Sequence, residues 1–189
     1  MAELALPLVI AVAGPFYAFA LLLTTAGVLK LRDPRPTSGA LRAAGLPEQP
    51  GFVRIMGLVE VGIGAGGIAE GGRIAAGALG LAYLAFAAFV VVAIARGLPL
   101  TSCGCFGKED TPPSATHIVI TALAAGTGAA VAVEPIGPLG EALATQPWGG
   151  VPLLLGALVS AYLAYVILTA LAGTMSIVSN GPSARGVRT

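Results

Sequence analysis

The two cysteines are the chemically most informative residues of this chain, because a single glycine separates them. Cys103 and Cys105 are the only thiols in 189 residues, and they lie in a short polar segment between two long apolar runs. The intervening glycine lets the backbone bend tightly enough for two thiols at positions i and i+2 to meet. A disulfide formed in this way is strained, and strained disulfides are readily reduced and tend to be catalytic. The spacing therefore favours a redox pair that opens and closes.

Two other interpretations of the cysteine pair stay open. In one, the thiols are half of a metal site with His117 as a third ligand, although zinc requires a fourth ligand that the spacing does not supply. In the other, they are two small inert side chains. The sequence thus predicts no complete metal site. A permanent structural disulfide does not fit a segment that faces the cytosol.

Two ionisable residues are candidates to assist the thiols. His117 is the only histidine, twelve residues after Cys105, and it could stabilise a thiolate or simply be a polar residue at the membrane interface. Glu60 lies about 12 Å inside an apolar stretch, where an ionisable side chain is costly and is a functional candidate. Its partner is expected to be Lys30, Arg54 or His117, unless the carboxyl is protonated. The alternative role for Glu60 is a buried polar contact that orients helices.

The elements that position these residues are membrane-spanning helices. The chain is 56% hydrophobic and 10% charged, whereas soluble domains carry about 25% charged residues. Five stretches are long enough to span a bilayer, and in lipid the backbone must satisfy its hydrogen bonds within each helix. They are residues 4–29, 52–69, 74–95, 114–133 and 151–173. The sequence predicts an all-α polytopic membrane bundle with a four-helix core and a fifth C-terminal transmembrane helix.

The spans are expected to form a single domain, residues 1–173, followed by a polar tail, residues 174–189. Neither an internal repeat nor a second domain is indicated. In the first loop, residues 38–44 are expected to form one or two helical turns closed by Gly45.

The glycine-rich second span carries a pattern with two interpretations. Residues 62–67 match G-x-G-x-x-G, but a dinucleotide site is excluded because that motif must follow a strand. Gly62 and Gly66 are instead expected to form a close-packing face between helices. A tight turn at residues 70–73 predicts that the second and third spans form an antiparallel hairpin.

The basic residues predict how the protein is oriented. With five spans, Arg73 falls on one side of the membrane and the other nine basic residues fall on the opposite side. Those nine are Lys30, Arg32, Arg35, Arg42, Arg54, Arg96, Lys108, Arg185 and Arg188. Because cytoplasmic loops are enriched in Lys and Arg, we expect a plasma or inner membrane protein with its cysteine loop and C-terminus in the cytoplasm and its N-terminus outside. The net charge of +1 argues against a nucleic acid partner.

The order of these features resembles the methylamine-utilisation MauE family, within the wider DoxX-like group of small redox-associated membrane proteins. The matching positions are residues 26–31 and Pro34 after the first span, residues 45–47, Glu60, residues 103–107 and His117. Over residues 5–173 the resemblance implies a four- or five-helix membrane protein that helps to mature an extracytoplasmic enzyme. In methylamine-using bacteria that client is the disulfide-rich subunit of methylamine dehydrogenase. By this resemblance Cys103 and Cys105 are the redox pair and Glu60 is the membrane carboxylate.

The sequence thus predicts an integral membrane thiol–disulfide redox protein that supports maturation of a cysteine-containing partner, with oxidoreductase activity left open. One alternative is a non-catalytic accessory or assembly subunit of a larger membrane complex. Another is a carrier of a small molecule or lipid, with Glu60 in a cavity between helices. No residue indicates a firm cofactor. Cytoplasmic thiols that serve an exported client need a route for electrons across the membrane. That route is either a quinone-like carrier or a change in the side from which the cysteine pair is accessible. The client and the oligomeric state are left open.

Overall fold

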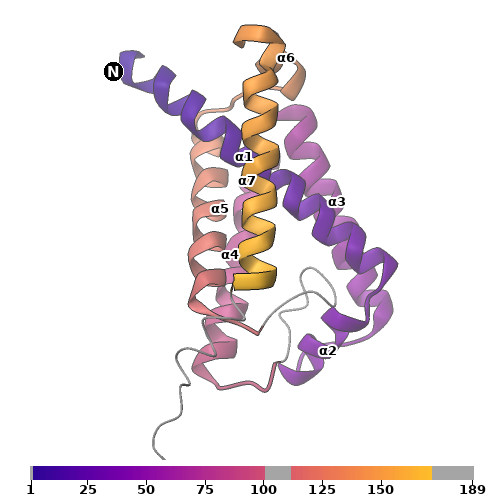
Figure 1. Cartoon of the computed structure of the whole chain (residues 1–189). Helices are drawn as coiled ribbons and strands as arrows, with labels where there is room; N and C mark the ends of the chain where they lie inside the picture. Colours follow the sequence, from indigo (N-terminus) through magenta and orange to yellow (C-terminus); the bar gives the residue numbers. More distant parts are fainter. Residues whose placement is uncertain (1, 101–111, 172–189) are drawn as a thin grey trace, which may run out of the picture.

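The computed structural model describes residues 2–100 and 112–171, and this part of the chain contains helices and no strands (Figure 1). Five helical segments are long and apolar enough to cross a membrane. They are α1 (Ala2–Arg32), α3 (Pro50–Glu70), α4 (Arg73–Ala95), α5 (Ala115–Val133) and α7 (Val151–Val166), which continues into a π-helical turn, η3 (Ile167–Leu171). The predicted all-α membrane bundle is confirmed, with small differences at the helix ends.

Within the described residues, three shorter helices connect the spans. They are α2 (Arg35–Ala43), α6 (Leu139–Ala144) and the 3-10 helix η2 (Pro147–Gly150). The helix expected at residues 38–44 exists but begins earlier, because Pro36 is tolerated in a first turn, where its missing N–H is not needed. Gly45 follows the helix with φ +71, as the predicted closing residue requires.

The bundle has two ends, which we name after the short helices that lie there. The α2 end also carries the last turn of α4 and the first turns of α3 and α5, whereas the α6 end carries the short turn between α3 and α4 (Figure 1). Arg73 begins α4 at the α6 end. The other described basic residues lie toward the α2 end, namely Lys30, Arg32, Arg35, Arg42, Arg54 and Arg96. The charge asymmetry used to predict orientation is therefore present in the fold.

Glycines bring the spans into backbone contact in two pairs, α1 with α3 and α4 with α5. A Cβ on Gly27 of α1 would lie 2.5 Å from the carbonyl oxygen of Gly57 on α3. Between α4 and α5, a Cβ on Gly128 would lie 2.7 Å from the Cα of Gly80. No larger side chain fits at such contacts, so small residues allow these pairs to pack at close range.

The glycine face predicted for the second span is wrong. A Cβ on Gly62 or Gly66 would meet nothing within 4 Å. The face of α3 that packs on α1 carries Gly57 and Gly64 instead, and a Cβ on Gly64 would lie 2.6 Å from the carbonyl oxygen of Ala20. These two positions are seven residues apart, which is two helical turns, so they share one face. Residues 62–67 lie wholly within the helix α3 and do not follow a strand, which agrees with the exclusion of a dinucleotide site.

The predicted hairpin between α3 and α4 is present, but its two helices diverge. Gly71 ends α3 with φ +54, and α4 begins two residues later. Beyond the turn α3 packs mainly on α1, and α4 packs mainly on α5. The buried side chains of Phe16, Leu79 and Val131 fill the space between the pairs toward the α6 end. Toward the α2 end a cavity remains between α3 and α4, and Lys30 and Glu60 line it.

Replacing Gly57 by alanine should destabilise the protein, because the added Cβ would lie 2.8 Å from the carbonyl oxygen of Gly27. Overpacking of this kind costs about 1–3 kcal/mol. We expect a lower Tm for Gly57→Ala in thermal unfolding of the detergent-solubilised protein. Gly62→Ala on the same helix is the matched control and should leave Tm unchanged or raise it, because alanine favours the helix over glycine. Equal Tm values for the two variants would contradict the assigned α1–α3 contact.

Candidate functional site

A buried ion pair joins α1 to α3 toward the α2 end. The Nζ of Lys30 donates a hydrogen bond to Oε2 of Glu60 over 2.7 Å. The two side chains are only 5% and 19% exposed. A buried charge is tolerated when an opposite charge compensates it, so each group depends on the other. Of the partners expected for Glu60, Lys30 is the one that the structure shows.

The same glycines that close the α1–α3 interface position this ion pair. Gly27 is three residues before Lys30, and Gly57 is three residues before Glu60, so each glycine shares a helix face with a charged residue. A Cβ on Gly57 would lie 3.1 Å from the Cβ of Lys30. Lys30 therefore starts beside Gly57, and its side chain reaches Glu60 about one turn along α3.

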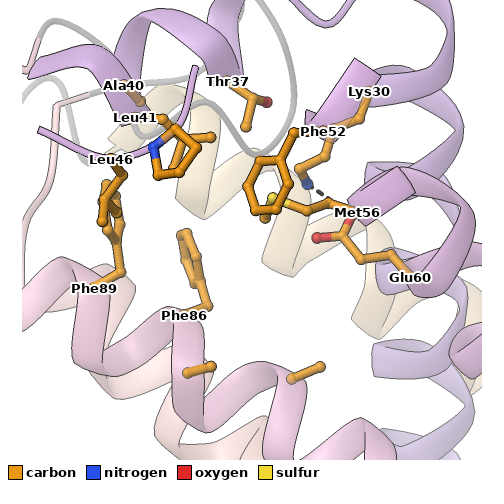
Figure 2. A pocket seen from close by; sticks show the side chains of 13 residues that line it. Lys30, Thr37, Ala40, Leu41, Leu46, Phe52, Met56, Glu60, Phe86 and Phe89 are labelled. Carbon is orange, nitrogen blue, oxygen red and sulfur yellow. Dashed lines mark hydrogen bonds and ion pairs between the residues drawn. The ribbon is translucent and has the colours of Figure 1, made fainter. Parts of the chain in front are cut away.

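The ion pair is the charged part of the wall of an otherwise apolar cavity of about 300 Å³ between α3 and α4. Phe52 and Met56 from α3 face Phe86 and Phe89 from α4 across this space (Figure 2). Leu41 of α2 lines the side nearest the end of the bundle. The cavity occupies the region where the two helix pairs diverge.

A second, smaller cavity of about 60 Å³ lies within the bundle and shares the ion pair with the first. Lys30 and Glu60 line both cavities, and Tyr83 and Thr121 contribute to the smaller one. The hydroxyl of Tyr83 donates to the carbonyl oxygen of Phe19 over 2.8 Å, which ties α4 to α1 beside it. The ion pair is thus accessible from the α2 side and from the interior of the bundle.

His117 lies in the first turn of α5 and is almost completely buried, at 1% exposure. Its Nδ1 is 2.9 Å from Oγ of Ser114, the residue that precedes α5 in extended conformation. Thr121, one turn further on, donates to the carbonyl oxygen of His117 over 2.6 Å and also lines the smaller cavity. His117 therefore lies at the start of a candidate membrane span, with its side chain buried in the bundle. Its action on the thiols stays a prediction.

Cys103 and Cys105 lie outside the described residues. The described chain before them ends at Leu100, which is 7% exposed and packs against Ala40 of α2 and Ala93 of α4. Ala40 also lines the larger cavity. Leu100 thus lies beside α2, at the end of the bundle toward which the ion pair lies.

Sequence reasoning left two parts of this site open. It offered Lys30 as one of three expected partners of Glu60, and the structure shows Lys30 buried against it. It raised a cavity at Glu60 only as an alternative and did not name the aromatic side chains that line it. One signal was available, since Lys30 and Glu60 each follow a glycine by three residues on helices that must pack together. The spacing of Phe86 and Phe89 on one helix face was a second signal.

Fold and site together define a small polytopic helical membrane protein with a buried ion pair beside an apolar cavity. A family model described as methylamine utilisation protein MauE matches residues 8–134, which is more than half of the chain. The chain belongs to the MauE family. No curated protein and no solved structure matches it. The match includes Glu60, both cysteines and His117 and stops before α6, so α7 and the predicted domain limit at residue 173 lie beyond it.

Removing one member of the ion pair should destabilise the protein more than removing both. Glu60→Gln leaves the charge of Lys30 buried without compensation, and breaking a buried pair costs about 3–5 kcal/mol. Combining Lys30→Met with Glu60→Gln removes both charges and should restore most of that lost stability. The measurement is the free energy of unfolding in mixed micelles for the two single variants and the double variant.

The surface pair of Arg42 and Glu48 provides the control, because Nε of Arg42 donates to the Glu48 carboxylate in an exposed position. Glu48→Gln should leave the unfolding free energy nearly unchanged, since solvent screens such pairs. The test compares decreases in the free energy of unfolding. If the decrease in the Lys30/Glu60 double variant equals the sum of the decreases in the two single variants, the two groups are not coupled and the assigned ion pair is wrong.

Proposed function

We propose that this MauE-family membrane protein is a thiol–disulfide redox protein that supports maturation of a partner protein. The observation that carries the proposal is the packing of Leu100, the last described residue before the cysteines, at the end of the bundle toward which the Lys30–Glu60 pair lies. The family match, which includes Cys103 and Cys105 and concerns methylamine utilisation, supports the same role.

In the proposed exchange, a disulfide between Cys103 and Cys105 oxidises two thiols of the partner. One partner thiolate attacks a sulfur of the disulfide, and the mixed disulfide is then resolved by the second partner thiol. The partner gains a disulfide, while two electrons and two protons pass to the cysteines of this chain. His117 follows the cysteine segment at the start of α5, and its proposed role is to favour the thiolate form of a departing cysteine.

Glu60 is the proposed proton-handling group of the site. It is the carboxylate that lines both cavities, and Lys30 compensates its charge within the membrane span. Ionisable residues inside membrane spans commonly serve proton or substrate pathways. The protons that accompany thiol oxidation need such a group near the cysteine segment.

Trapping tests the redox role directly. Cys105→Ser leaves Cys103 able to form a mixed disulfide by attack on a partner disulfide, and it removes the Cys105 thiol that would open this mixed disulfide in the wild type. We expect a covalent adduct on non-reducing gels that disappears with reductant, and no adduct from the Cys103→Ser/Cys105→Ser variant. The proposal fails if the double serine variant supports maturation of the partner as well as the wild type does. Co-purification of a stoichiometric partner with that variant would then favour an accessory subunit.

Thiol labelling tests the predicted orientation. In intact cells a membrane-impermeant maleimide should not label Cys103 or Cys105 until the membrane is permeabilised, because the basic residues predict that this end faces the cytoplasm. The control is Trp148→Cys in the cysteine-free variant, since Trp148 is 85% exposed at the α6 end and should be labelled in intact cells. The reverse labelling pattern would show that the charge bias misleads in this protein.

A further inference from the structure

We propose that the cavity between α3 and α4 binds the ring of a neutral quinone-class lipid, with the polar ring substituents at the Lys30–Glu60 pair. This ligand site goes beyond the proposed redox function, because binding requires neither cysteine. Three properties of the cavity carry the inference, namely the shape and chemistry of its walls, the charge balance of its polar end and its access from the bilayer.

The walls of the cavity suit a flat ring. Phe52 and Met56 lie on one side, and Phe86 and Phe89 lie on the other (Figure 2). The rings of Phe86 and Phe89 are stacked, with centroids 6.5 Å apart and an interplanar angle of 26°. Aromatic faces and thioethers make favourable contacts with planar rings. The volume of about 300 Å³ is at the lower limit of ordinary ligand pockets, which fits one ring system better than a two-chain phospholipid.

The charge at the polar end of the cavity sums to zero, which favours a neutral ligand. Lys30 and Glu60 compensate each other over 2.7 Å, so an entering anion or cation would be left without a counter-charge. The ammonium group of Lys30 has three N–H donors and gives one to Glu60, while the carboxylate retains acceptor capacity. The pair can therefore donate to a ring carbonyl and accept from a ring hydroxyl. A quinone presents the first of these groups, and a quinol presents the second.

The cavity is accessible from the side that faces lipid. Phe52 is 42% exposed and Ala85 is exposed, yet both line the cavity and both belong to candidate membrane spans. A ligand that is insoluble in water can thus enter between α3 and α4 without leaving the bilayer. Its tail can stay among the lipid chains while the ring reaches the ion pair.

A quinone in this cavity also has a chemical use in the proposed redox function. When the dithiol of Cys103 and Cys105 closes to a disulfide, it releases two electrons and two protons, and their uptake converts a quinone to a quinol. That step rests on the proposed function. Binding of the ring does not, so the two can fail separately.

Binding of a radiolabelled short-tailed benzoquinone to the full-length protein in detergent micelles tests the site, by equilibrium dialysis. Ala85→Trp should fill the cavity and weaken binding at least tenfold. Ala88→Trp is the matched control, because Ala88 is also exposed on α4 but does not line the cavity, and it should bind as the wild type does. Similar Tm values for the two variants would establish that both are folded.

Two further variants separate the ligand site from other roles. Glu60→Gln should weaken binding about tenfold, because a hydrogen bond to a charged group is lost. Cys103→Ser/Cys105→Ser should bind the quinone unchanged even if it abolishes partner maturation. Equal binding by Ala85→Trp and Ala88→Trp overturns the proposal. Displacement of the quinone by an equal mole fraction of oleate or phosphatidylglycerol also overturns it, because the occupant would then be an acyl chain.

Discussion

The ion pair of Lys30 and Glu60 is the constraint on which the rest of this structure depends. In a span, neither charge has water to solvate it, so each group must remain within hydrogen-bonding distance of the other. That requirement fixes the register of α1 against α3, because a shift of one turn would separate the groups by about 5.4 Å. Gly27 and Gly57 make the register attainable, since any Cβ there would collide with the opposite backbone.

Close packing within each helix pair leaves space between the pairs. α1 and α3 meet through glycine, and α4 and α5 meet through Gly80 and Gly128, so the backbones are nearest inside the pairs. Toward the α6 end large side chains fill the gap, and toward the α2 end the gap becomes the cavity. The site therefore results from how the helices are paired, because the pairing leaves an apolar space beside the ion pair toward the α2 end, where Leu100 packs.

Parts of this arrangement follow from the sequence and parts do not. The five spans are predictable because length and apolar content determine a membrane helix almost alone. Glu60 is predictable as a site residue, because a carboxyl in such a run is costly. The pairing of Glu60 with Lys30 is not predictable, since the pairing depends on how α1 and α3 are rotated about their axes. The glycine face was misjudged for the same reason: Gly62 and Gly57 lie on different faces of α3, and only packing shows which one meets α1.

The turn at Gly71 makes the two ends of the bundle mechanically unequal. A Cβ at this position would lie 1.8 Å from the carbonyl oxygen of Gly137, so the α3–α4 turn is held against the segment that leads into α6. Toward the opposite end α3 and α4 are separated by the cavity, which α2 also lines. Lateral pressure from the surrounding lipid therefore acts on a gap that is fixed at one end and compressible at the other. Bilayer thickness and chain order are expected to set the width of the space beside Lys30 and Glu60.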